Sequence, residues 1–186
     1  MKSFRWLYAR LVFHPTLLWN MFNARVLKRW NWWDLVDDTV IIGARPSVSH
    51  VDELKQLGVT GVVNTCEEYR GPVTQYEVAG IEQLYVPTVD FTHPTLESVE
   101  KGVEFIQRHS EGKGLVYVHC KAGRARSATI VVCWLIHAHG MTPQEAQAHL
   151  QTKRKHVNPR VFERAVVRAF YEKQTAELAE SAAEDG

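Results

Sequence analysis

Short apolar runs alternate with amphipathic segments along most of the chain. Consecutive β-branched and apolar residues predict strands over 39–44, 59–65 and 114–119, and a weaker run predicts another over 81–87. Apolar residues that recur every three or four positions predict helices between and after these strands, over 49–58, 74–80, 96–110, 126–140, 142–154 and 158–174. This alternation is typical of an α/β domain with a mostly parallel central sheet flanked by helices.

The predicted elements divide the chain into three parts. We place the folded domain over 34–173 and expect the acidic, small-residue-rich end, 174–186, to fray. Within the domain, the run 114–119 is apolar almost throughout, as in a central strand that is covered on both faces. Ligands bind beyond the carboxyl ends of such strands, so Cys120, the next residue, is predicted to lie at the functional edge of the sheet.

The first part, 1–33, is basic and rich in tryptophan. It holds six Lys or Arg residues, five of the six tryptophans and no acidic residue. Its apolar residues mostly step by three or four, which predicts an amphipathic helix that Pro15 kinks or divides. Such a helix lies in a membrane interface, packs its aromatic stripe on the domain, or serves as a mitochondrial targeting segment. No uncharged run reaches the roughly 18 apolar residues of a membrane-spanning helix.

Composition narrows the classes of function. A chain of 186 residues with 45% hydrophobic and 23% charged residues is typical of a globular domain. A formal net charge of +1 gives no sign of a nucleic-acid partner. Three cysteines are too few, and odd in number, for a disulfide framework, which favours a reducing compartment. Cys133 falls in the middle of a predicted apolar helix, where we expect a core residue.

One stretch, VHCKAGRARSATI, places a thiol among cations where a predicted strand gives way to a predicted helix. A helix N-terminus and nearby cations lower the pKa of a cysteine and favour its reactive thiolate. Arg126 can bind two phosphate oxygens with its planar fork, and the Ser127 hydroxyl can stabilise the Cys120 thiolate. Small residues let the intervening backbone N–H groups converge on one anion. The predicted phosphate-binding residues are Lys121, Ala122, Gly123, Arg124 and Ala125.

The spacing of Cys120 and Arg126, with His119 before and Ser127 after, resembles the active-site loop of the cysteine-dependent protein tyrosine phosphatase superfamily. The resemblance implies a dual-specificity phosphatase-like fold and a phosphocysteine intermediate, formed without a metal or another cofactor. Members of this superfamily take a general acid from a loop upstream of the cysteine strand. Asp90, in the segment PTVDFTHP, is placed in that way, and His93 and Glu97 are nearby alternatives.

Three features favour a substrate with more negative charge than phosphotyrosine. Lys121 and Arg124 add positive charge beyond Arg126, and the basic N-terminal part offers a contact with a membrane. The segment Glu67, Glu68 and Tyr69 follows a predicted strand and therefore lies at the same edge of the sheet as Cys120. These residues either line the substrate cavity or are solvated loop charges, and the sequence leaves both interpretations open.

Several further segments resemble, in order, the family of mitochondrial phosphatases that convert phosphatidylglycerophosphate to phosphatidylglycerol for cardiolipin synthesis. They are LVFHPTLLWNMF, VDDTVIIGARP, EEYR, GIEQLYVPTVDFT, KGVEFI, YVHCKAGRARSAT and MTPQEA. The resemblance implies an anionic phospholipid substrate, a membrane surface as partner, and a peripheral place on the matrix side of the inner mitochondrial membrane. Family members often carry Glu where this chain has Arg70, which leaves the part played by this loop open.

Other functions remain as alternatives. A phosphoinositide phosphatase, or a dual-specificity protein phosphatase that acts on phosphotyrosine, phosphoserine and phosphothreonine, would use the same chemistry. A scaffold that only binds phosphate would have lost Cys120, Arg126 or the acid, and all three are present. Cys66, at the end of the second predicted strand, is either a small buried residue or a partner for Cys120 in a reversible disulfide.

Overall fold

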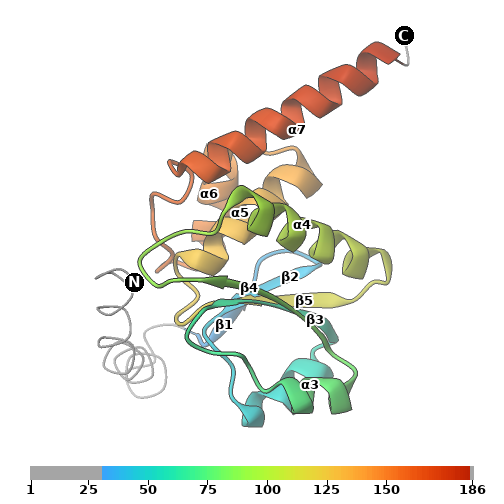
Figure 1. The fold of residues 1–186 in the computed structure, drawn as a ribbon, viewed down its shortest axis with the longest axis vertical. Helices are drawn as coiled ribbons and strands as arrows, with labels where there is room; N and C mark the ends of the chain where they lie inside the picture. The colour runs from blue at the N-terminus through green and yellow to red at the C-terminus, as the bar shows by residue number, and fades with distance from the viewer. Residues whose placement is uncertain (1–30, 185–186) are drawn as a thin grey trace, which may run out of the picture.

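Five strands form one sheet in the structure of this protein, a computed structural model that describes residues 31–184 (Figure 1). Their order across the sheet is β1-β2-β5-β3-β4. All neighbouring pairs are parallel except β1 and β2, which run antiparallel. The prediction of an α/β fold with a mostly parallel sheet is therefore confirmed. The strands are β1 Trp33–Leu35, β2 Val40–Gly43, β3 Val59–Cys66, β4 Glu82–Thr88 and β5 Leu115–His119.

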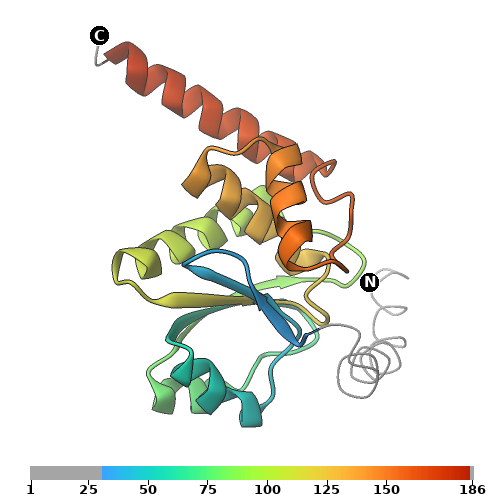
Figure 2. The ribbon, with the colours of Figure 1, turned by 180° about the vertical axis from the view of Figure 1, so that it is seen from behind.

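Helices cover both faces of the sheet (Figures 1 and 2). The short helices η2, Val48–His50, α2, Val51–Gln56, and α3, Val73–Ala79, lie on one face. The other face carries the larger hydrophobic core and the longer helices. These are α4 Leu96–Glu111, α5 Arg126–His139, α6 Pro143–Lys153 and α7 Ala165–Glu184. Because β5 is central and covered on both faces, the loop that follows it is held between the two layers.

The edge strand β1 was not predicted from the sequence, and it corrects the boundary of the N-terminal part. Trp33 packs edge-on against Tyr117 of β5, with ring centroids 6.0 Å apart, and Trp32 stacks on His50 at 5.7 Å. These two tryptophans therefore belong to the folded domain rather than to the segment 1–33. Residues 1–30 lie outside the described residues, and so does the amphipathic helix expected there.

The last helix also differs from the prediction. No helix begins at Asn158: its side chain accepts a hydrogen bond from the backbone of Arg160 at 2.9 Å, and its backbone N–H donates to the carbonyl oxygen of Arg124, in the loop after β5, at 2.8 Å. Tied to that loop, the chain makes turns before α7 begins at Ala165. The helix then continues to Glu184, through the segment expected to fray, because Ala, Glu and Leu are strong helix formers.

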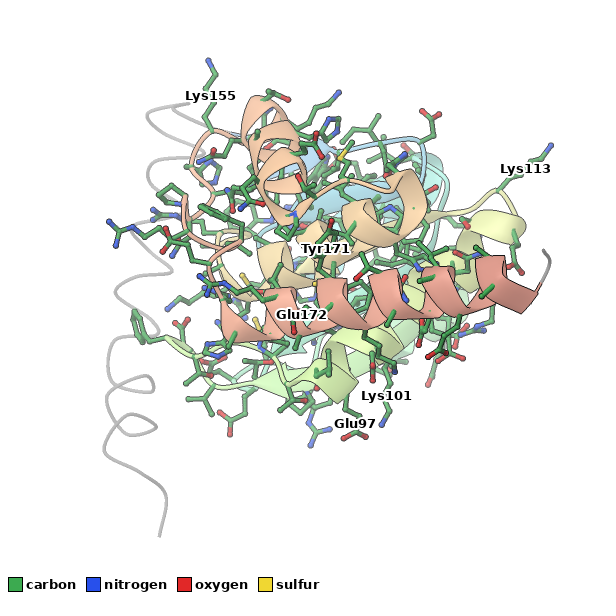
Figure 3. All side chains as sticks on the ribbon, turned by 90° about the horizontal axis from the view of Figure 1, so that it is seen from above. Glu97, Lys101, Lys113, Lys155, Tyr171 and Glu172 are labelled. Atoms are coloured by element: carbon green, nitrogen blue, oxygen red, sulfur yellow. The ribbon has the colours of Figure 1, made fainter. Side chains whose placement is uncertain are left out.

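Seen from above, α7 crosses the helical layer, and its C-terminal half projects beyond the other helices (Figures 1 and 3). Tyr171, near the middle of α7, is partly buried against the larger core, whereas Leu178 is 70% exposed. In the described part of the chain, no helix combines the length and the apolar character that crossing a bilayer requires.

Candidate active site

The loop between β5 and α5 folds back around the sulfur atom of Cys120. The backbone N–H of Gly123 donates a hydrogen bond to Sγ at 3.2 Å, and the Ser127 hydroxyl donates another at 3.4 Å. Helix α5 begins at Arg126, so its N-terminus lies at the end of this loop. The structure thus brings together the thiol, the small residues and the helix N-terminus that the sequence placed in one motif.

The surroundings of Cys120 favour its thiolate. Burial alone raises the pKa of the thiol, but the charge of Arg126 and hydrogen bonds from Ser127 and the Arg124 backbone outweigh burial. The net result is a pKa of about 6, against about 8.5 for an ordinary cysteine. Cys120 is therefore mostly ionised at neutral pH, as a sulfur nucleophile must be.

A glycine is required at position 123 because the loop packs tightly against β2. Gly123 has a φ of +65°, in the left-handed region that disfavours side chains. A Cβ atom at this position would lie 2.5 Å from the carbonyl carbon and oxygen of Gly43. The loop is thus fixed by backbone-to-backbone packing on the side away from the sulfur.

Arg154, at the end of α6, holds the outside of the loop. Its Nε donates to the carbonyl oxygen of Gly123 at 2.8 Å, and its Nη2 donates to that of Ala122 at 3.1 Å. Asp34 of β1 pairs with Nη1 at 2.5 Å and neutralises the buried guanidinium. Lys155, the next residue, points into solvent instead (Figure 3). Arg154 was not predicted from the sequence, because an arginine in the last turn of a helix is ordinary and nothing in the pattern marks it as buried.

Arg126 turns its guanidinium back toward the site, where carboxylates surround it. Its Nη1 donates to Glu68 at 2.8 Å and to the carbonyl oxygen of Thr88 at 2.8 Å. Its Nη2 lies 3.1 Å from Oδ1 of Asp90. The side chains of Arg126 and Glu68 are only 2% and 1% exposed, so this ion pair is screened from water.

Asp90 stands in the loop after β4, beside the loop that holds Cys120. Its Oδ2 pairs with Nζ of Lys121, and its backbone N–H donates to Glu68 at 3.3 Å. The two alternative acids are not brought to the site: His93 is exposed, and Glu97 pairs with Lys101 at 2.7 Å on the outer face of α4 (Figure 3). Of the three candidate acids, the structure places only Asp90 next to Arg126.

The segment after β3 contributes unevenly to this site. The Glu68 carboxylate points inward and joins Arg126 to the Asp90 backbone, whereas Glu67 accepts a hydrogen bond from Tyr85 at 3.2 Å through its backbone carbonyl oxygen. The hydroxyl of Tyr69 donates to the carbonyl oxygen of Pro46 at 2.6 Å, so its ring spans the ends of β3 and β2. Of this segment, the Glu68 carboxylate therefore contacts both Arg126 and the loop of Asp90.

The two additional cations of the loop are engaged in different ways. Lys121 is buried in its pair with Asp90, and its Nζ lies 5.4 Å from the centre of the Phe91 ring. Arg124 is exposed and donates from Nε to the carbonyl oxygen of His156 at 2.9 Å, toward the segment that precedes α7. A third cation, Arg45, was not predicted from the sequence. It follows β2, and its guanidinium carbon lies 4.5 Å from the centre of the Tyr69 ring.

His119 and Cys66, which are also buried near the site, are neutral. Burial lowers the pKa of His119 to about 3, and the ring stacks on Tyr117 with centroids 5.7 Å apart. Burial raises the pKa of Cys66 well above its ordinary value, and Cys133 is buried in α5 as expected. Within residues 31–184, no group of three metal-ligating side chains is placed to hold an ion.

Together these residues can perform displacement at phosphorus. A thiolate lies at the centre of a loop of N–H donors, a guanidinium faces it, and a carboxylate stands beside the guanidinium. This arrangement supplies a nucleophile, a clamp for phosphate oxygens and a proton donor. Glu68 contacts Arg126 and the Asp90 backbone, and Arg154 contacts the carbonyl oxygens of Ala122 and Gly123, so both residues fix the groups around Cys120.

Known proteins are similar to this chain in sequence and in fold. Residues 40–173 match the family described as dual specificity phosphatase, catalytic domain. The chain is 37% identical over 182 residues to phosphatidylglycerophosphatase and protein-tyrosine phosphatase 1 of Mus musculus, a match that covers 93% of this chain and 94% of the mouse protein. It is 38% identical over 157 residues to phosphatidylglycerophosphate phosphatase PTPMT1 of Arabidopsis thaliana, covering 83% of this chain and 45% of the plant protein. The crystal structure of PTPMT1 in complex with PI(5)P matches with a TM-score of 0.73 at 36% identity, over 80% of this chain and 99% of that one.

Proposed function

We propose, from the premise that this chain belongs to the dual-specificity phosphatase family, that it converts phosphatidylglycerophosphate to phosphatidylglycerol. The chain is a cysteine-dependent phosphatase. The substrate follows from the mouse and plant relatives, whose names give this activity at 37% and 38% identity. The observation that carries the mechanism is the position of Asp90 beside Arg126, next to the Cys120 thiolate.

In the first step, the Cys120 thiolate attacks phosphorus and the bond to the glycerol oxygen breaks. Arg126 and the loop N–H groups bind the phosphoryl oxygens, whose negative charge they match. Asp90, in its protonated form, gives its proton to the departing oxygen, so phosphatidylglycerol leaves as an alcohol rather than as an alkoxide. The products of this step are phosphocysteine and ionised Asp90.

In the second step, water hydrolyses the phosphocysteine. The Asp90 carboxylate accepts a proton from the attacking water, and the sulfur leaves as a thiolate. The low pKa of Cys120 makes it a good leaving group, and the Ser127 hydroxyl donates to the returning negative charge. Inorganic phosphate then leaves and Asp90 regains the proton-bearing form that the first step requires.

Glu68 supports this chemistry without touching the reacting atoms. Its carboxylate holds Arg126 at 2.8 Å and the Asp90 backbone at 3.3 Å, so it sets the distance between the phosphate clamp and the acid. Lys121 holds the other oxygen of Asp90. The remaining proposed contacts with phosphate come from the loop residues Ala122, Gly123, Arg124 and Ala125, and Tyr69 and Glu67 are proposed to complete the cavity wall.

We further propose a peripheral place on the matrix side of the inner mitochondrial membrane. The substrate lies in a bilayer, and residues 1–30, with six Lys or Arg residues and three tryptophans, have the composition of a helix that binds an anionic membrane surface. Co-sedimentation of the full-length protein with phosphatidylglycerol vesicles tests this contact. Replacing Arg25, Lys28 and Arg29 by Glu should release the protein from the vesicles, and unchanged sedimentation would contradict the proposal.

The experiment that tests the substrate is a phosphate-release panel. The full-length protein is given phosphatidylglycerophosphate, phosphoinositides and a phosphotyrosine peptide at matched phosphate concentrations, with Cys120→Ser as the blank. We expect the highest kcat/KM for phosphatidylglycerophosphate. A phosphoinositide phosphatase is the second candidate, favoured by the crystal structure of the related PTPMT1 in complex with PI(5)P. A higher kcat/KM for any other member of the panel would replace the proposed substrate.

A further inference from the structure

Arg45 adjoins the loop of Cys120 from the end of β2. It follows β2, and its backbone N–H donates to the carbonyl oxygen of Lys121 at 3.2 Å, so it adjoins the first residue after Cys120. The sheet order places β2 and β3 on the two sides of β5. Asp90, after β4, lies beyond β3, whereas Arg45 lies on the β2 side. The loops after β2 and β4 thus bring Arg45 and Asp90 to the loop of Cys120.

The side chain of Arg45 is fixed in place by Tyr69. Its guanidinium carbon lies 4.5 Å from the centre of the tyrosine ring, within the range of a cation–π contact. The tyrosine is itself held, because its hydroxyl donates to Pro46 and its carbonyl oxygen accepts from Asn64 at 2.8 Å. Arg45 is half-buried, so it keeps access to solvent. Much of the entropy cost of ordering an arginine for ligand binding has thus been met by the fold.

The charge of Arg45 reaches the centre of the site. Burial is the main cause of the lowered pKa of His119, the residue before the nucleophile, and the charges of Arg126 and Arg45 add to it. Two cations thus act on the same buried ring. Arg126 and Lys121 bind the carboxylates of Glu68 and Asp90, and Arg45, over the ring of Tyr69, adds to the positive field of the site.

We propose that Arg45, held on Tyr69, binds the phosphodiester of a glycerophospholipid head group while the terminal phosphomonoester occupies the loop of Cys120. The inference rests on the proposed function, because it needs a substrate that carries a second phosphate beyond the leaving glycerol. A guanidinium suits this task, since its planar fork binds two oxygens of one phosphate. The subsite favours such a head group over a simple monoester, and it acts before the bond to phosphorus breaks.

The test uses water-soluble substrates, so that binding to a membrane does not contribute. One is the deacylated head group, glycerophosphoglycerophosphate, which has both phosphates, and the other is glycerol 3-phosphate, which has only the monoester. In Arg45→Gln we expect the KM for the two-phosphate substrate to rise about tenfold relative to that for glycerol 3-phosphate, which corresponds to the loss of one charge-assisted contact. The kcat for the two substrates should fall little, because Arg45 does not touch the reacting atoms.

Arg70 provides the matched control. Its guanidinium also lies 4.5 Å from the centre of a tyrosine ring, that of Tyr85, but it follows β3 and is exposed. Arg70→Gln should leave the KM ratio of the two substrates unchanged. Arg45→Lys keeps the charge and loses the fork, so its ratio should lie between those of the wild type and Arg45→Gln. Thermal unfolding of each variant shows whether the fold is kept.

The proposal would be overturned if Arg45→Gln changed the KM for both substrates by the same factor. It would also be overturned if Arg70→Gln changed the ratio of the two KM values as much as Arg45→Gln does. A variant that unfolds is replaced by Arg45→Lys, for which an unchanged ratio has the same meaning. If the head group is not hydrolysed, its Ki against the hydrolysis of p-nitrophenyl phosphate replaces KM in the comparison. Failure of the proposed function would give a different result from failure of this inference. The wild-type enzyme would then have a higher kcat/KM for the phosphopeptide than for intact phosphatidylglycerophosphate.

Discussion

Lys121 and Asp90 form an ion pair beside the nucleophile, with side chains only 8% and 13% exposed. The lysine belongs to the loop that holds phosphate, and the aspartate belongs to the loop after β4. Because the carboxylate also lies 3.1 Å from Arg126, two cations from the phosphate loop hold it at the edge of the site. The loop proposed to bind phosphate thus also positions Asp90, the proposed acid.

The first prediction concerns this pair. Lys121→Met removes one of the two cations that orient Asp90, so we expect kcat for phosphatidylglycerophosphate to fall about 10- to 100-fold. The effect on p-nitrophenyl phosphate should be smaller, because its phenolate leaves without a proton. Steady-state kinetics with both substrates measure the difference. Lys101→Met, on the outer face of α4, is the control, and equal losses for the two substrates would show that Lys121 does not act through the acid.

The pH dependence of the reaction should report the state of Cys120. Since the thiol has a pKa of about 6, kcat/KM should fall as the pH drops below about 6 and the thiolate becomes protonated. Ser127→Ala removes a hydrogen bond to the charged form, which raises the pKa and moves this acid limb to higher pH. The rate of alkylation by iodoacetamide, followed against pH, measures it directly. A limb that stays in place in Ser127→Ala, or also moves in Ser127→Thr, which keeps the hydroxyl, would contradict this assignment.

Glu68 should matter for both stability and catalysis. Glu68→Gln leaves the buried charge of Arg126 without its nearest carboxylate partner, so we expect the free energy of unfolding to fall by about 3 kcal/mol. The kcat/KM should also fall by at least about tenfold, because the clamp and the acid are no longer held together. Urea unfolding and phosphate release measure the two effects. Glu97→Gln, on the exposed face of α4, should change neither, and a Glu68→Gln variant of wild-type activity would remove Glu68 from the site.

Gly123 and Gly140 have similar positive φ angles but different surroundings. Substituting each by Ala therefore distinguishes backbone strain from a steric clash of the added Cβ. Gly123 and Gly140 have φ values of +65° and +62°, but a Cβ meets the β2 backbone at 2.5 Å only at Gly123, and nothing within 4 Å at Gly140. Gly140→Ala should lower the free energy of unfolding by about 1 kcal/mol and keep full turnover. Gly123→Ala should abolish turnover even where the protein remains folded by circular dichroism. A Gly123→Ala enzyme as active as Gly140→Ala would show that the loop tolerates displacement.

The strands and most helices were predictable because their signals are local. The segment GLVYVH is apolar at nearly every position, and β5 indeed lies at the centre of the sheet. The helix predicted over 142–154 is α6, which begins at Pro143 behind a capping box of Thr142 and Glu145. The edge strand β1 carries no such signal: it is three residues long, and its Trp33 gains its place by packing on Tyr117.

For the site, the sequence placed the residues that share one motif but missed those brought in by the fold. Cys120 and Arg126 are six positions apart, so their meeting depends on one turn. Arg154 and Arg45 approach the loop from the end of α6 and the end of β2, and only the tertiary structure joins them to it. The motif likewise identified Lys121 as an additional cation but did not identify its partner, because Asp90 lies 31 residues away along the chain.

The bridge from Asp34 through Arg154 to the carbonyl oxygens of the phosphate loop bears on where the catalytic unit begins. The family match starts at residue 40, but Asp34 pairs with a guanidinium that is fully buried and holds two peptide groups of the loop. A fragment that begins at residue 40 would lack Asp34 and leave the buried guanidinium of Arg154 without its counter-ion. A buried charge without a counter-ion is strongly destabilising. The smallest autonomous phosphatase in this chain therefore has to include the β1 segment ahead of the boundary.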